Sequence, residues 1–219
     1  MNWFLKNNYP DYWNSYSSEF DGKQEQNLSS LRFVVFDTET TGLNISKDRI
    51  LSIGCIAITD LKIKVSDQLE IYISQEKFNA DSVKIHGLLK KGTFEKLSEK
   101  EAIKRFLDYI GNSVLVAHHA AFDVSMINNC LKRLNLPKLK NVVLDTGHLY
   151  YKTKPNNQMS HWSLDHLAQV YNIPLHDRHT ASGDAYITAL IFLKILPRLV
   201  HNQPIQIKNL IHKRRIGLL

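Results

Sequence analysis

Asp37 and Glu39 are the residues of this sequence whose types and spacing most clearly indicate a chemical role. They follow residues 31–36, a continuous run of apolar and β-branched residues that predicts a buried central strand. Side chains on a strand alternate between its two faces, so both carboxylates are expected to point the same way. Buried neighbouring carboxylates repel each other and lose solvation unless protons or metal ions compensate, and hard cations such as Mg²⁺ favour oxygen ligands of this kind. The pair is therefore a candidate metal site.

Two further acids lie on the apolar faces of predicted helices. Asp123 is followed by apolar residues three, four and seven positions later, and Asp184 by apolar residues three and seven positions later. Positions with this spacing share one helix face, here the face turned to the core. For either acid alone, a carboxylate bonded to backbone N–H groups at the start of a helix is the simpler interpretation. Four inward-facing acids together favour a shared chemical role.

The remaining pattern predicts a sheet covered by helices. Strands are expected at 50–59 and 64–74, joined by a turn near Asp60 into an antiparallel pair, and at 114–117 and 142–145. Helices are expected at 99–110, 121–134, 163–172 and 182–196. Strands followed by alternating helices and strands are typical of a mixed sheet flanked by helices.

The two ends of the chain differ from its middle. Residues 1–30 are expected to form an appendage, in which aromatic residues at helical spacing after Pro10 predict a short amphipathic helix, followed by a polar linker at 21–30. The aromatic face is expected to pack on the protein's own domain, with a partner protein or a nucleic-acid stacking surface as alternatives. Residues 31–200 form the expected main domain, and residues 201–219 a basic C-terminal tail.

Composition bounds the class of protein. The chain has 219 residues, 43% hydrophobic and 22% charged, which is typical of one ordinary globular α/β domain. Its net charge is +7, and residues 1–30 hold two Lys against four Asp or Glu, so the remainder carries +9 and would attract a polyanion. Cys55 and Cys130 lie in apolar segments and are expected to be reduced. Without a membrane-length apolar run or a signal-peptide core, the expected location is cytoplasmic, with no membrane partner.

Three segments of the sequence resemble the motifs of one family, the DEDDh 3′-to-5′ exonucleases, typified by the epsilon proofreading subunit of bacterial DNA polymerase III. They are Asp-Thr-Glu-Thr-Thr-Gly at 37–42, the segment 118–123 ending in Asp123, and 179–185 around Asp184. His179, five residues before the last acid, assigns the histidine branch, because the tyrosine branch would place Tyr at Thr180. The resemblance implies an α/β, ribonuclease-H-like exonuclease fold with a central five-stranded mixed sheet flanked by helices.

The resemblance also implies a mechanism that uses two divalent metal ions, Mg²⁺ or Mn²⁺. Asp37, Glu39 and Asp184 would bind the first ion, Asp37 would bridge to the second, and Asp123 would act through water molecules. His179 would be the general base, since imidazole exchanges protons near neutral pH.

A pocket for the terminal nucleotide is the next implication. The resemblance assigns its lining to the turn after the first acids, Thr40, Thr41, Gly42 and Leu43. Three further residues could complete the pocket or simply pack in the core: His86, within a segment similar to the polymerase-associated members, His118 and Phe122. His119 departs from the asparagine common at its position in the family.

The expected function is hydrolysis of phosphodiester bonds from the 3′ end of single-stranded DNA, with release of nucleoside 5′-monophosphates. One alternative is a 3′-to-5′ exoribonuclease, and another is a proofreading subunit that acts in complex with a DNA polymerase through the N-terminal helix. A homodimer is a further expected assembly. A catalytically inactive binding module conflicts with the five catalytic positions all being filled.

Overall fold

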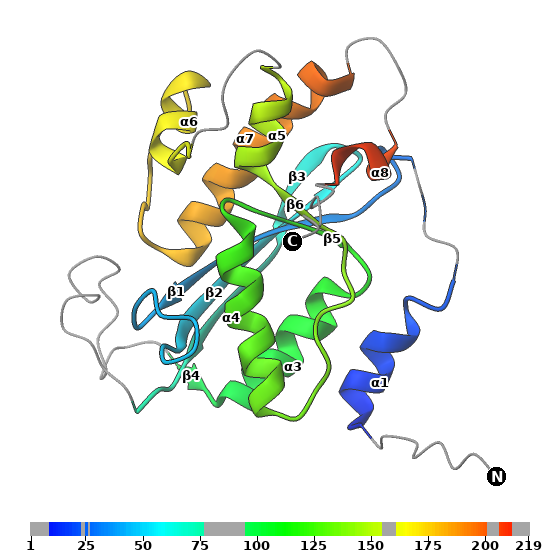
Figure 1. The fold of residues 1–219 in the computed structure, drawn as a ribbon, viewed down its shortest axis with the longest axis vertical. Coiled ribbons are helices and arrows are strands. Elements are labelled where there is room, and N and C mark those ends of the chain that lie inside the picture. Colours follow the sequence, from blue (N-terminus) through cyan, green and yellow to red (C-terminus); the bar gives the residue numbers. More distant parts are fainter. Residues whose placement is uncertain are drawn as a thin grey trace, which may run out of the picture.

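Strands of mixed direction form the sheet at the centre of the molecule. A computed structural model describes residues 9–22, 25, 27–76, 95–154, 161–200 and 206–211, and within these ranges the sheet has six strands in the order β4-β3-β2-β1-β5-β6 (Figure 1). The strands are β1 (Phe33–Thr40), β2 (Ile50–Thr59), β3 (Lys62–Ile73), β4 (Lys96–Leu97), β5 (Val114–Ala117) and β6 (Val143–Asp145). β1 pairs antiparallel with β2 and parallel with β5, which pairs parallel with β6. The predicted α/β class with a mixed sheet is confirmed.

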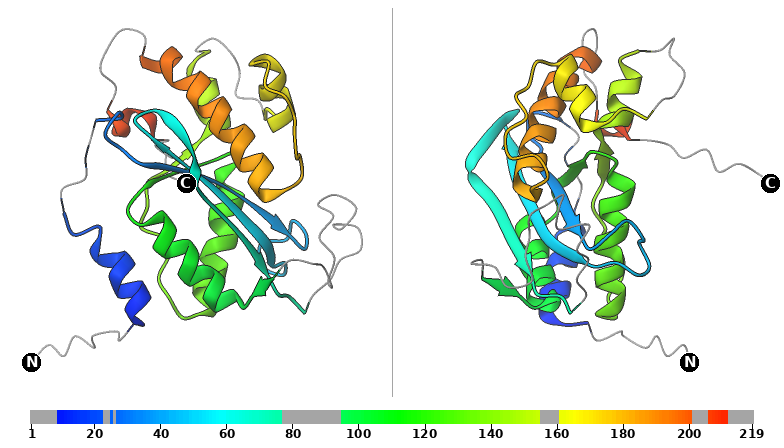
Figure 2. Two further views of the ribbon diagram at one scale, coloured as in Figure 1. Left: turned by 180° about the vertical axis from the view of Figure 1, so that it is seen from behind. Right: turned by 90° about the vertical axis from the view of Figure 1, so that its left-hand side faces the viewer.

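Helices cover both faces of the sheet. They are α1 (Asp11–Ser18), α3 (Glu99–Ile110), α4 (Ala120–Arg133), α5 (Thr146–Lys152), α6 (Leu164–Val170), α7 (Ala181–Val200) and α8 (Ile207–Leu210). Because side chains alternate along β1, Phe33 and Val35 join the core that α5 to α8 cover, whereas Val34 and Phe36 join the core under α1, α3 and α4. The two helix groups occupy the upper and lower halves of Figure 1, and both views of Figure 2 show the same separation.

The sheet differs from the sequence prediction in its number of strands. The resemblance predicted five, and the described residues contain a sixth, the two-residue β4, which pairs parallel with β3 at Tyr72 and Ile73. Two residues are too few for an alternating pattern, so the sequence carried no signal for this strand. β1 also continues to Thr40, beyond the predicted end at residue 36, because Asp37 to Thr40 remain paired with β2.

Two short helices and one extension were not predicted. α5 follows β6 directly and was absent from the prediction, as was α8, whose Ile207 and Leu210 are buried although they fall in the predicted C-terminal tail. α7 ends at Val200, four residues later than predicted, and passes through Pro197. A proline removes one helical N–H bond but does not stop a helix that packing supports.

The aromatic face of α1 packs on the domain, as predicted. Trp13 and Tyr16 are 2% and 1% exposed and belong to the core shared with α3 and α4. The Tyr16 hydroxyl donates to Asn141 Oδ1 at 2.6 Å and accepts from the Lys140 backbone N–H at 2.9 Å. This intramolecular packing takes up the face that could otherwise have served as a stacking surface or partner site.

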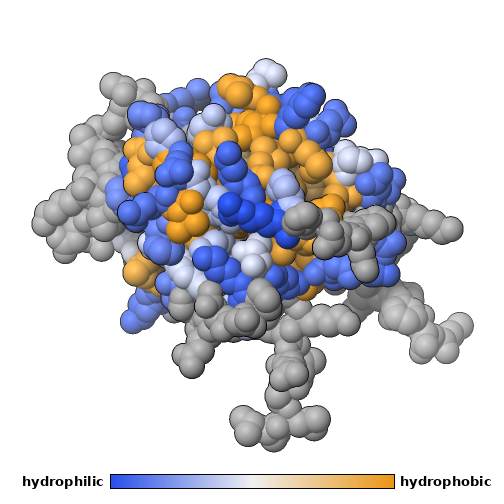
Figure 3. Space-filling view, turned by 90° about the horizontal axis from the view of Figure 1, so that it is seen from above, coloured by the Kyte–Doolittle hydropathy of each residue, from blue (hydrophilic) through white to orange (hydrophobic). Residues whose placement is uncertain are grey.

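α7 is the longest described helix and the most apolar. Besides its buried residues, Leu190, Leu193 and Leu199 pack against the core with part of their surface accessible. Seen from above, hydrophobic side chains gather among hydrophilic ones on the end of the molecule formed by α5 to α8 (Figure 3). In the described parts of the chain, no helix is both long and apolar enough to cross a bilayer.

One close approach brings α7 to the acidic strand. Gly54 on β2 pairs with Asp37 on β1, and a Cβ at Gly54 would lie 2.3 Å from the carbonyl carbon of Ala181 and from the Ser182 nitrogen. Only glycine leaves room for backbone at that distance. The first turn of α7, which carries Asp184, therefore lies directly beside Asp37.

Candidate active site

The acids predicted from the sequence come together at one end of the sheet. One oxygen from each of Asp37, Glu39 and Asp184 lies within 4.8 Å of the other two. Asp37 and Glu39 point to the α7 side of β1, where the first turn of α7 places Asp184, only 7% exposed. An all-oxygen donor set of this size suits a hard divalent cation.

The fourth acid reaches the same place from the opposite face of the sheet. Asp123 lies in the first turn of α4 and is 4% exposed. Its Oδ1 accepts hydrogen bonds from the Thr38 backbone N–H at 3.1 Å and the Thr38 hydroxyl at 2.6 Å. Because Thr38 stands between Asp37 and Glu39, these bonds tie α4 to the acidic end of β1.

Burial raises the pKa values of all four carboxyls, and repulsion by the other acids of the cluster adds to this at Asp37 and Glu39. The pKa of Asp37 lies well above its usual range because of burial and then the charges of the other three acids. Burial raises the pKa of Glu39 and of Asp123 to about 7 each, and it also raises the pKa of Asp184. Without a cation the cluster therefore retains protons close to neutral pH, and a divalent ion would displace them.

Arg178 holds Asp184 in place. Its guanidinium donates from Nη1 to Asp184 Oδ2 and from Nε to Asp165 Oδ1 at 2.6 Å. The other oxygen, Asp184 Oδ1, is buried and has no hydrogen-bond partner among the described residues. A buried oxygen without a donor beside two further carboxylates fits a cation site. Asp165, in the first turn of α6, thus anchors this arginine.

The loop before α7 is held in an unusual backbone conformation. Asp177 and His179 have positive φ angles of 54° and 62°, in the left-handed region that non-glycine residues rarely adopt. The Thr180 hydroxyl donates to the Asp177 carbonyl at 2.7 Å and accepts from the Gly183 N–H at 3.1 Å. A Cβ at Gly183 would lie 2.1 Å from the Asp177 carbonyl oxygen, so the loop packs on α7 only because position 183 is glycine.

The acids open into a pocket of about 420 Å³. Its walls include Asp37, Glu39 and Asp184 together with Arg178 and the exposed imidazole of His179. Three more histidines complete the opposite side: His118, His119 and His161. Four of the five predicted catalytic residues therefore line one pocket, and the fifth, Asp123, lies behind it on Thr38.

The predicted nucleotide-binding turn is well ordered by its own hydrogen bonds. The Thr40 hydroxyl donates to the Gly42 carbonyl at 2.8 Å, and the Thr41 hydroxyl donates to Asp48 Oδ1 at 2.9 Å. A Cβ at Gly42 would lie 2.6 Å from Asp48 Oδ2, which is too close, so a larger residue would fit only if the Asp48 side chain moved. Leu43, at the tip, is 83% exposed. The threonines therefore shape the turn, and Leu43 is the residue available for contact.

The other residues predicted to line the nucleotide pocket lie in different environments. His118 lines the acidic pocket with both ring nitrogens engaged, Nδ1 by the Thr146 hydroxyl and Nε2 by the Trp162 carbonyl, each at 2.9 Å. Burial, and secondly the neighbouring His119, lower the pKa of His118 to about 4. Phe122 is half-buried against the core under α1, α3 and α4. His86 lies outside the described residues.

Sequence reasoning did not find Arg178 or His161. Neither belongs to a motif of the predicted family, and each is a single polar residue in a loop. The position of Arg178 directly before His179 could have suggested that Arg178 lies near the site. It could not have predicted the bond between Arg178 and Asp165.

Comparison with known proteins identifies the family of this chain. The family model described as an RNase T-type exonuclease matches residues 34–192. The chain belongs to this exonuclease family. Relatives include the PolC-type DNA polymerase III of Caldanaerobacter subterraneus, 37% identical over 193 residues, which are 86% of this chain and 13% of that polymerase. The epsilon subunit of DNA polymerase III from Buchnera aphidicola is 32% identical over 177 residues, 76% of this chain and 73% of that subunit.

The solved structures agree with the family at the level of the fold. A zinc-bound complex of E. coli exonuclease I with single-stranded DNA superposes with a TM-score of 0.66 at 17% identity, covering 79% of this chain and 42% of that one. The predicted exonuclease family and its ribonuclease-H-like fold are thus confirmed. The chain spans about an eighth of the PolC-type relatives, 12% to 13% of their length.

Proposed function

We propose that this exonuclease-family chain is a metal-dependent 3′-to-5′ exonuclease that hydrolyses single-stranded DNA from its 3′ end and releases nucleoside 5′-monophosphates. The observation that carries the proposal is the juxtaposition of three acids within 4.8 Å with the buried, unbonded Asp184 Oδ1. Burying neighbouring carboxylates is unfavourable unless cations neutralise their charge. Divalent cations held by such a cluster can catalyse the hydrolysis of a phosphodiester.

The acids have distinct proposed roles. Asp37, Glu39 and Asp184 would hold one divalent ion, Mg²⁺ or Mn²⁺, and Asp37 and Asp123 would hold a second, Asp123 through water. When bound, two such ions activate water and stabilise charge on the phosphoryl group and the departing 3′ oxygen. Arg178 keeps Asp184 oriented through its bond to Oδ2. The Asp184 carboxylate is thus oriented before any ion arrives, which lowers the cost of binding.

His179 is the proposed general base. It lies exposed on the wall of the acidic pocket, on the left-handed loop before α7. From this position the imidazole takes the proton of the attacking water and returns it to solvent. The proposed terminal nucleotide lies on the turn Thr40 to Leu43, with Leu43 beside the base and His118 and Phe122 on the other side; the predicted contribution of His86 stays a prediction.

DNA is the proposed substrate in preference to RNA. The matched relatives are parts of DNA polymerases, and the exonuclease I complex holds single-stranded DNA. The net charge of +7 favours any polyanion and does not separate the two. The proposed place of action is the cytoplasm.

A second candidate function is proofreading in complex with a DNA polymerase. The observation that favours it is the 37% identity to a segment within a PolC-type polymerase. A homodimer is the alternative assembly. Light scattering of the purified chain, alone and mixed with a polymerase of this type, distinguishes a monomer, a homodimer and a polymerase complex by mass.

The direct test uses 5′-labelled single-stranded DNA and RNA of one sequence. With Mg²⁺ or Mn²⁺ we expect a ladder that shortens from the 3′ end, faster on DNA, and no products with EDTA. Asp37→Ala should remove the activity while circular dichroism shows a folded protein, because losing a carboxylate relieves repulsion. The control is Asp108→Asn, an exposed acid on α3, which should degrade DNA normally. Hydrolysis by Asp37→Ala, or a labelled mononucleotide as the first product, contradicts the proposal.

A further inference from the structure

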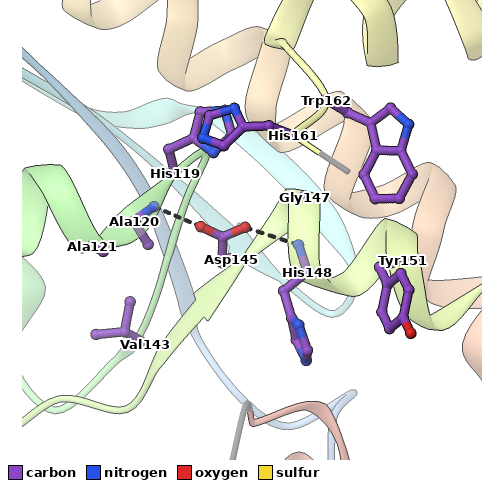
Figure 4. A pocket seen from close by; sticks show the side chains of 10 residues that line it. All are labelled: His119, Ala120, Ala121, Val143, Asp145, Gly147, His148, Tyr151, His161 and Trp162. Carbon is purple, nitrogen blue, oxygen red and sulfur yellow. Dashed lines mark hydrogen bonds between the residues drawn. The ribbon is translucent and has the colours of Figure 1, made fainter. Parts of the chain in front are cut away.

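A second pocket, of about 300 Å³, adjoins the acidic one and shares His119 and His161 with it. We call it the side pocket; its main walls are His119, His161, Trp162, Tyr151, Val143 and Asp145. Figure 4 shows the rings of His119 and His161 lying over one another above Asp145, with Trp162 and Tyr151 on one side and Val143 on the other. The side pocket therefore continues the active-site cleft beyond the two histidines.

Flat rings form the boundary between the two pockets. The rings of His119 and His161 are stacked, with centroids 3.8 Å apart and planes 27° apart. His118 continues the row at 4.2 Å from His119 and is fixed by Thr146 and the Trp162 carbonyl. His119 takes a left-handed φ of 57° as the residue before α4, which turns its side chain out of the helix. The row of imidazoles leads from the acids to the side pocket.

The side pocket lacks the features of a phosphate site. Its acid, Asp145, accepts the Ala120 N–H at 2.7 Å and the His148 N–H at 2.9 Å. The carboxylate thus offsets the positive ends of α4 and α5 that would otherwise attract an anion. No lysine or arginine is among its described wall residues. Burial lowers the pKa values of His118 and His119, so their rings are neutral at pH 7.

These properties select the chemical class of the ligand. Stacked imidazole rings, an indole, a phenol and aliphatic carbon suit a flat, uncharged aromatic group, and a nucleobase is the group of this kind that the proposed substrate brings. We propose that the side pocket binds a base of the substrate strand on the 5′ side of the bond being cleaved. This inference rests on the proposed exonuclease function.

The strand order gives the direction. The turn proposed for the terminal nucleotide follows β1, whereas His118 and His119 follow β5, and Asp145 ends β6. Since the sheet runs β1-β5-β6, the side pocket lies beyond β5 from both that turn and the acids of β1. A strand with its 3′ nucleotide on the turn and its phosphate at the acids continues towards β6. Its base can turn into the side pocket only when unpaired, which makes the pocket a selector for single strands with little sequence preference.

Fluorescence of 2-aminopurine, which stacking quenches, tests the inference without turnover. Asp37→Ala protein would be titrated with oligonucleotides carrying 2-aminopurine at the first, second, third or fourth position from the 3′ end. We expect quenching at one internal position to be lost in His161→Ala and in His119→Asn, which keeps a residue tolerant of left-handed φ. His166→Ala, an exposed histidine on α6, is the matched control and should retain all quenching.

Kinetics supply the second measurement. An abasic site at the identified position should lower kcat/KM of the wild-type protein by about 10-fold, the usual scale of one base-stacking contact, and should add little to His161→Ala. Equal quenching in the variants, or equal kcat/KM for abasic sites at the second to fourth positions, would overturn the side-pocket assignment while the wild-type ladder stands. Absence of that ladder would instead overturn the proposed function.

Discussion

Replacing Asp123 with asparagine should stabilise the metal-free protein. Asp123 is 4% exposed and lies among three other carboxyls, and its Oδ1 accepts two hydrogen bonds from Thr38. The asparagine carbonyl oxygen can accept the same two bonds. Asp123→Asn therefore removes a buried charge and its repulsion while it keeps the contact that joins α4 to β1.

The magnitude follows from the pKa of Asp123, which burial raises from 3.8 to about 7. Because the folded-state pKa is higher, the folded protein holds a proton that the unfolded chain releases, so stability falls as pH rises from about 4 to about 7. The full difference corresponds to about 4 kcal/mol. Relative to wild type, the variant should gain little at pH 4, more at pH 5 and about 4 kcal/mol at pH 8.

Urea denaturation in EDTA at pH 5, 6, 7 and 8 measures these gains, and thermal unfolding should show a shift of about 10 °C at pH 8. Asp108→Asn, on the exposed side of α3, is the control for loss of one negative charge. Saturating Mg²⁺ should reduce the variant's advantage at pH 8 without removing it, since an ion at 100 times its Kd stabilises wild type by about 2.7 kcal/mol and the variant by less.

Two outcomes would contradict this prediction for Asp123. If Asp123→Asn were less stable than wild type at pH 8 in EDTA, the carboxylate would be compensated within the protein and would not need a cation. If the gain were the same from pH 5 to pH 8, it would come from a cause other than ionisation of Asp123.

The loop before α7 supplies two further predictions. Arg178→Lys should lower kcat/KM by about 10-fold and weaken Mn²⁺ binding in calorimetry, because one ammonium does not replace the planar fork that bridges Asp165 and Asp184; unchanged Mn²⁺ affinity would show that the bridge does not orient Asp184. Gly183→Ala should lower kcat by at least about 10-fold with the fold retained by circular dichroism, because its Cβ would meet the Asp177 carbonyl at 2.1 Å and displace the loop. Gly22→Ala, with nothing within 4 Å of the new Cβ, should have wild-type activity, and a normal kcat in Gly183→Ala would mean that the loop has no part in the reaction.

Much of the site could be predicted from local pattern. Alternation along a strand places Asp37 and Glu39 on one side of β1, and helical spacing turns Asp123 and Asp184 to the core, because both periods are properties of the backbone itself. The motif around Asp184 further predicted a family that residues 34–192 match. The packing of the aromatic face of α1 also followed from helical spacing, since so large an apolar face is rarely left in water.

Other features depend on contacts between residues far apart in the sequence. Thr38 donates a hydrogen bond to Asp123, 85 residues later in the sequence. Gly54 leaves room for the backbone of Ala181 and Ser182 at the start of α7. The side pocket exists because His119, which follows β5, stacks on His161 in the segment before α6. Local pattern in the sequence therefore predicted which side chains face inward and which family they resemble. Which of them touch depends on the folded chain, because local periodicity carries no information on where distant segments meet.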